Sequence, residues 1–223
     1  MIKNFTFVSL FVGYVKLTGF LPMWLFCRPR VFLAEGAKRH LPRPCIMVSN
    51  HQKLLDFVLY LLVFPFQTLH FPMAEVLFRK NWLFSLFLNL LGGIRVDREA
   101  KSFDFVSDCL EVLDKGRCLG IFPQGRLPVD GKPFPFTVST AFIAAHSDAP
   151  IVPVYTDGNY GFGKRVNVVI GAPIHLEDYK KNGLTEQEQL EHLTAVLEEM
   201  VWGLGKQLDA RLGNGKEKQS QTV

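Results

Sequence analysis

The chain has 223 residues, a length that suits a single compact domain with a sizeable core. Apolar residues make up 48% of it and Phe occurs 20 times, so the apolar surface needs a second place of burial besides the core. The net charge of +4 is modest and spread along the chain, without the basic stripe of a nucleic-acid-binding module. The four cysteines form no C-x-x-C pair, which favours free thiols and predicts no metal site.

The N-terminal segment, residues 1–30, is predicted to associate with a membrane. It is apolar from Phe5 to Cys27 but interrupted, so two short interfacial helices are expected. A secretory signal is disfavoured because no small-residue cleavage site follows, and a single transmembrane anchor stays open as an alternative. The interruptions are Gly13, Lys16, Gly19 and Pro22.

Beyond this segment, short apolar runs alternate with stretches of helical spacing. The expected strands are residues 45–49, 68–73, 94–96, 118–122, 151–155 and 166–170, and the expected helices are residues 54–64, 82–91, 102–115, 138–146 and 185–212. This alternation predicts an α/β fold, in which helices flank a mostly parallel central sheet. One domain is expected over residues 31–212, followed by a disordered polar tail at residues 213–223.

The segment from Ser49 to Asp56 lies where a predicted strand ends and a helix begins, a common place for reactive groups in α/β sheets. His51 and Asp56 are five residues apart, so they face each other only if a loop separates them. If they meet, Asp56 orients the imidazole and His51 acts as a general base. The alternative is an Asp that only caps the helix and an incidental His.

Two further stretches carry arginines next to glycines. The predicted strand ending at Phe122 leads into a Gly/Pro turn with Gln124, Gly125 and Arg126, which could hold a phosphate or an oxyanion. Arg98 follows the short strand at residues 94–96, where a surface ion pair with Asp97 is the plain alternative.

In this order and at these separations, the stretches resemble the PlsC-like 1-acylglycerol-3-phosphate acyltransferase family. The His-x4-Asp motif of the family matches His51 and Asp56, and its Gly-to-Asp-Arg strand resembles residues 93–98. Its third motif, Phe-Pro-Glu-Gly-Thr-Arg-Ser, is similar to residues 122–128, and residues 149–154 resemble the fourth. The third motif departs from the family: Gln124 replaces the Glu, Arg126 the Thr and Leu127 the Arg.

The resemblance implies an O-acyltransferase of phospholipid biosynthesis. His51 and Asp56 would be catalytic, and Arg98, Gln124, Gly125 and Arg126 would bind the acceptor. The implied co-substrate is acyl-CoA or an acyl carrier protein, with no further cofactor, and the implied acceptor is 1-acylglycerol-3-phosphate, giving phosphatidic acid. The implied partners are membrane lipids, at the cytoplasmic face of a bacterial inner membrane. Alternatives are another lysolipid acceptor, or a catalytically silent lipid-binding or scaffold protein on the same fold.

Overall fold

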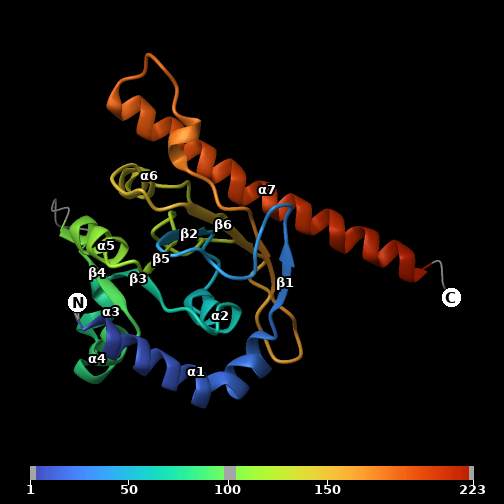
Figure 1. Ribbon diagram of the computed structural model, residues 1–223. Coiled ribbons are helices and arrows are strands. Elements are labelled where there is room, and N and C mark those ends of the chain that lie inside the picture. Colours follow the sequence, from blue (N-terminus) through green and yellow to red (C-terminus); the bar gives the residue numbers. More distant parts are fainter. Residues whose placement is uncertain (1–3, 98–103, 221–223) are drawn as a thin grey trace.

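The computed structural model describes residues 4–97 and 104–220, arranged around one seven-stranded sheet (Figure 1). The strand order is β1-β7-β6-β2-β5-β3-β4. The strands are β1 (Arg30–Leu33), β2 (Cys45–Ser49), β3 (Leu69–Ala74), β4 (Gly93–Val96), β5 (Cys118–Ile121), β6 (Ile151–Thr156) and β7 (Asn167–Ile170). The helices are α1 (Phe5–Cys27), α2 (Asp56–Val63), α3 (Glu75–Arg79), α4 (Trp82–Leu90), α5 (Asp104–Asp114), α6 (Val138–Ala145), the 3₁₀ turn η1 (Leu176–Tyr179) and α7 (Glu186–Ser220).

The predicted α/β fold with a mostly parallel sheet is confirmed. Strands β6, β2, β5, β3 and β4 are parallel to one another, and among the strand pairs of the described residues only β6 and β7 are antiparallel. Because the five parallel strands end at one edge, the loops after them converge there. Strand β1 was not predicted, because it is a short strand at the sheet edge that directly follows the apolar segment, and no alternation marks it.

Helices cover both faces of the sheet, and β2 shows why. All five of its residues are buried, and successive side chains point to opposite faces. Cys45 and Met47 pack in a core with α2, whereas Ile46 and Val48 pack in a second core with α5, α6 and α7. Helix α1 lies outside α2, on the side of the sheet opposite α7 (Figure 1).

The two short N-terminal helices that the sequence predicted are instead one helix of 23 residues, α1. Its Gly residues each cost about 1 kcal/mol relative to Ala, and Pro22 removes one backbone hydrogen bond. Tertiary packing outweighs these costs, because Val8 and Val12 are fully buried against α2 and α4. The helix keeps one stripe on the domain and leaves the rest of its surface exposed.

The C-terminal helix α7 runs to Ser220, past residue 213, where the sequence predicted the disordered tail to begin. Once a helix is nucleated, each further residue adds a hydrogen bond, and Lys216, Glu217, Lys218 and Gln219 favour helix, whereas Gly213 and Gly215 disfavour it. The structure thus has helix over residues 213–220, where a tail was expected, and residues 221–223 lie outside the described residues.

Candidate active site

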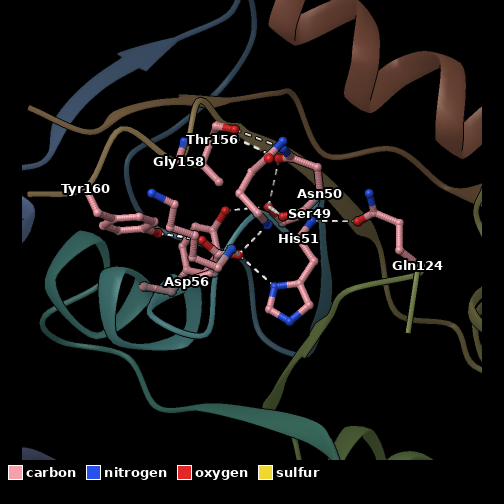
Figure 2. Close-up of polar contacts among 11 residues, drawn as sticks. Ser49, Asn50, His51, Asp56, Gln124, Thr156, Gly158 and Tyr160 are labelled. Atoms are coloured by element: carbon pink, nitrogen blue, oxygen red, sulfur yellow. Dashed lines mark hydrogen bonds and ion pairs between the residues drawn. The ribbon is translucent and has the colours of Figure 1, made fainter. Parts of the chain in front are cut away.

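The loop between β2 and α2 brings His51 and Asp56 together (Figure 2). His51 Nδ1 lies 2.6 Å from Asp56 Oδ2, and the side chains are 16% and 0% exposed. The same Asp56 oxygen accepts the backbone N–H groups of Gln52 and Lys53, at 2.6 and 2.9 Å. Asp56 thus binds the loop backbone and the imidazole at once. It does not act as a helix cap, because α2 begins at Asp56 and its N-cap, Leu55, makes no side-chain cap hydrogen bond.

The partners of Asp56 determine the tautomer of His51. A carboxylate only accepts hydrogen bonds, so the neutral imidazole carries its proton on Nδ1 and leaves Nε2 with a free lone pair. The second oxygen, Oδ1, accepts the hydroxyl of Tyr160 at 2.5 Å. Burial and the charge of Asp56 raise the pKa of Tyr160, which keeps this phenol protonated as a donor. Nε2 of His51 points away from Asp56 (Figure 2) and is available to take a proton.

The loop is also tied to the neighbouring strand β6. The Asn50 side chain donates to the carbonyl oxygen of Thr156 and accepts the Thr156 N–H, both at 2.8 Å. Gly158, just after β6, has a φ of +62°, and a Cβ there would lie 2.6 Å from the Cβ of Gln52. Only glycine allows the two loops to approach this closely.

The turn after β5 supports His51 from the other side. Gln124 Oε1 accepts the backbone N–H of His51 at 2.6 Å, and the Phe122 ring stacks on the imidazole with centroids 4.3 Å apart. Because Oε1 is engaged in this way, Nε2 of Gln124 faces elsewhere. This Nε2 is buried without a hydrogen-bond partner, in a residue that is only 2% exposed.

A cavity of about 390 Å³ opens beside Phe122 and Gln124, which both contact His51. Its wall contains a second unsatisfied group, the hydroxyl of Thr140, which is 1% exposed. Arg126 lines the cavity with its guanidinium 4.8 Å from the Phe134 ring centroid. Apolar side chains form much of the rest: Met73, Val96, Phe105, Ile121 and Ile143. The cavity suits a ligand that has oxygen acceptors as well as an apolar part.

Residues 34–157 match the model of the acyltransferase family, which is more than half of the chain. This chain belongs to the acyltransferase family.

Curated relatives carry the same chemistry in their names. The chain is 32% identical over 114 residues to 1-acyl-sn-glycerol-3-phosphate acyltransferase BAT2 of Brassica napus, covering 50% of this chain and 32% of that protein. It is 27% identical over 190 residues to 1-acyl-sn-glycerol-3-phosphate acyltransferase of Cocos nucifera, covering 82% and 60%. The chain therefore spans between a third and three fifths of these two relatives.

A solved structure supports the fold. The 1-acyl-sn-glycerophosphate acyltransferase PlsC of Thermotoga maritima superposes with a TM-score of 0.65 at 22% identity, covering 92% of this chain and 83% of that one. At this identity the likeness shows a shared fold.

Three of the six predicted site residues of this acyltransferase line the cavity, whereas His51 and Asp56 are not among its lining residues. Gln124, Gly125 and Arg126 line it, and the Gly125 N–H is already used in a turn, at 2.9 Å from the carbonyl oxygen of Phe122. Arg98 lies outside the described residues, whereas its neighbour Asp97 is in the cavity wall. In the parts of the chain that the structure describes, no cluster of three or more His, Cys, Asp or Glu side chains could hold a metal.

Two contributing residues escaped the sequence analysis. Tyr160 contacts Asp56 from 104 positions away and lies beyond the region that matches the family model. Thr140 sits in α6, where a helix with apolar neighbours gives it no distinguishing pattern. Asn50 was visible only as the residue before His51.

Proposed function

We propose that the protein transfers an acyl chain from an acyl thioester, either acyl-CoA or an acyl carrier protein, to the hydroxyl of a lysophospholipid. The observation that carries the proposal is the His51–Asp56 pair at the carboxyl edge of the sheet, beside a cavity with unsatisfied polar groups. The names of the relatives favour 1-acylglycerol-3-phosphate as the acceptor and phosphatidic acid as the product.

The chemistry needs one base and no acyl-enzyme. His51 Nε2 removes the proton from the acceptor hydroxyl, and the hydroxyl oxygen attacks the carbonyl carbon of the thioester. The carbonyl oxygen becomes an oxyanion in the tetrahedral intermediate. When the intermediate collapses, the carbon–sulfur bond breaks and the thiolate takes the proton back from His51. Asp56 stabilises the imidazolium that exists between these steps.

The unsatisfied donors of the cavity fit the substrate oxygens. Gln124 Nε2 and the Thr140 hydroxyl would donate to a phosphate, ester or thioester oxygen that no protein group now supplies. Arg126 and Arg98 would bind the acceptor phosphate, since a guanidinium fork matches phosphate oxygens. These donors replace the carboxylate and the arginine that the family has in its third motif.

A membrane surface would supply both lipids, and two helices present apolar faces for it. Helix α1 is long and apolar enough to cross a membrane, and only 17% of its most apolar 18-residue stretch is buried in the protein. It packs on α4 through an edge-to-face contact of Phe11 and Phe87, with centroids 6.1 Å apart. Exposed large side chains cover both helices: Leu10, Tyr14, Leu17 and Phe20 on α1, and Trp82, Leu83 and Leu86 on α4. We propose that this surface inserts into a lipid leaflet.

The full chain in lipid vesicles should be given labelled acyl-CoA or acyl carrier protein together with a panel of lysolipids, and the products separated. The proposal predicts loss of thioester and formation of phosphatidic acid from 1-acylglycerol-3-phosphate, with at least about a hundredfold slower formation by the His51→Ala chain. A product only from another lysolipid would change the acceptor. Vesicle binding without thioester consumption for any acceptor would overturn the enzyme proposal and favour the silent lipid-binding protein.

A further inference from the structure

A second cavity, of about 240 Å³, lies at the opposite edge of the sheet from His51. Arg43 leads into β2 and Arg117 directly precedes β5, so both lie at the amino ends of strands whose carboxyl ends carry the candidate active site. The other wall is helix α1, through Ser9, Gly13 and Lys16. This cavity is thus a junction between α1 and the domain.

Three cations surround this cavity without an acidic counterpart. Lys16, Arg43 and Arg117 line it, and none of the other lining residues is Asp or Glu. Within residues 4–97 and 104–220, neither guanidinium makes an ion pair with a carboxylate. Three like charges around one small space repel one another, and an anion between them would remove that repulsion.

The hydrogen bonds assign different tasks to the three cations. The Lys16 ammonium, buried on α1, places its Nζ at 2.7, 3.2 and 2.5 Å from the carbonyl oxygens of Phe64, Pro65 and Gln67. It therefore satisfies carbonyl oxygens that follow α2. Its three N–H groups are all used, so Lys16 contributes positive charge to the cavity but no hydrogen-bond donor for a ligand. Arg43 donates to the carbonyl oxygen of Phe66 at 3.1 Å, and Arg117 donates to the Ser9 hydroxyl at 3.0 Å. Each guanidinium has five N–H groups, so most of them remain for a ligand.

The surroundings favour a lipid as the source of the anion. The cavity is smaller than a site for a drug-sized molecule, so it suits a headgroup phosphate rather than a whole lipid. Helix α1 carries exposed Leu10 and Leu17 next to the cavity-lining Ser9 and Lys16, so acyl chains could continue along its apolar face. Guanidinium groups match phosphate oxygens in pairs.

We propose that this cavity binds the phosphate of an anionic phospholipid at a site separate from the catalytic one. Because Ser9 and Lys16 belong to α1 while Arg43 and Arg117 belong to the domain, the phosphate would hold the membrane helix and the domain together. The site does not depend on acyl transfer, so measurements of lipid binding alone can test it.

The test is flotation of the full chain with vesicles of phosphatidylcholine, with or without phosphatidylglycerol. The Arg43→Gln/Arg117→Gln chain should lose at least tenfold of the preference for anionic vesicles, given the usual contribution of a cation near a lipid surface. The matched control is Lys181→Gln/Lys206→Gln, which removes the same charge from exposed positions near or on α7, across the sheet from α1. Its preference should stay within about twofold of the unchanged chain, because those charges lie far from the lipid surface.

A third variant covers the case in which the double Arg variant does not fold. Gly13→Leu narrows the cavity without strain, because a Cβ at Gly13 meets nothing within 4 Å and Leu favours helix. It should reduce the ratio of anionic to neutral vesicle binding even though Leu adds apolar surface. Equal losses in the Arg variant and its control, or an unchanged ratio in Gly13→Leu, would overturn the site. Inorganic phosphate can also be added to the detergent-solubilised chain and its thermal unfolding measured. If phosphate raises the Tm but the chain shows no preference for anionic vesicles, the lipid is overturned as the source of the anion.

Discussion

The loop that carries His51 and the turn that carries Gln124 lie side by side but differ in how fully their polar groups are satisfied. Asp56 accepts four hydrogen bonds, from the His51 ring, two backbone N–H groups and Tyr160. Gln124 uses its oxygen on the His51 backbone but leaves its buried nitrogen without a partner. We expect the two regions to have different roles: the saturated network would hold a base in place, and the unsatisfied polar groups would bind the oxygens of a substrate.

The substitution His51→Ala should have the largest effect on catalysis. If the saturated loop exists to hold a base, kcat should fall by about 10²–10⁴-fold, the usual contribution of a positioned base. The KM for the acceptor should change little, because the unsatisfied wall is intact. Steady-state kinetics with circular dichroism as a folding control measures both, and a variant that keeps a tenth of its kcat would contradict the role of His51.

Two substitutions at Gln124 separate its anchoring oxygen from its free nitrogen. Gln124→Leu removes the acceptor of the His51 N–H, so kcat should fall by about tenfold or more, as expected when a buried donor loses its partner. Gln124→Glu keeps an acceptor there, so kcat should stay near its original value while the KM for a phosphate-bearing acceptor rises by roughly fivefold to tenfold. Kinetics with a lysolipid that carries a phosphate monoester measures both. An unchanged KM in Gln124→Glu would show that Nε2 does not meet the substrate.

Arg126→Ala tests an exposed residue that lines the cavity. Its guanidinium contacts the Phe134 ring and has no carboxylate partner among the described residues, so removal should leave the fold unchanged. The KM for the acceptor should rise by roughly fivefold with kcat little altered, the pattern of a lost binding contact. Arg126→Lys should recover only part of the affinity, since the fork is lost. Equal KM values in all three chains would remove Arg126 from the binding site.

Tyr160→Phe should have the smallest effect on catalysis of the substitutions in the hydrogen-bond network of Asp56. It removes one of four donors to Asp56 and should lower the free energy of unfolding by about 1.5–3 kcal/mol, as for hydrogen bonds to charged groups. Denaturant unfolding measures this loss. The kcat should drop only a few-fold, because the His51 contact remains. A kcat loss as large as that of His51→Ala would mean that Tyr160 does more than position Asp56.

Local pattern in the sequence predicted the parallel-rich sheet and most elements, because buried strands and amphipathic helices leave periodic apolar signals. It also placed His51 and residues 124–126 just after strands, and the structure joins His51 to Gln124 and to Asp56 by hydrogen bonds. The pattern failed where local signals conflicted with packing. Gly13, Gly19 and Pro22 argued for a broken N-terminal segment, yet contacts of one buried stripe keep α1 continuous.

By itself, the sequence determined the fold class and the order of the reactive residues, since these follow from patterns within a few neighbouring positions. The packed fold alone shows that Tyr160 completes the shell of Asp56, that Gln124 lines a cavity and has a buried nitrogen without a partner, and that Arg43 and Arg117 share one space with α1. The physical reason is that a hydrogen bond or a charge cluster depends on distance in space. Residues far apart along a chain come within that distance only when the sheet and its helices have packed.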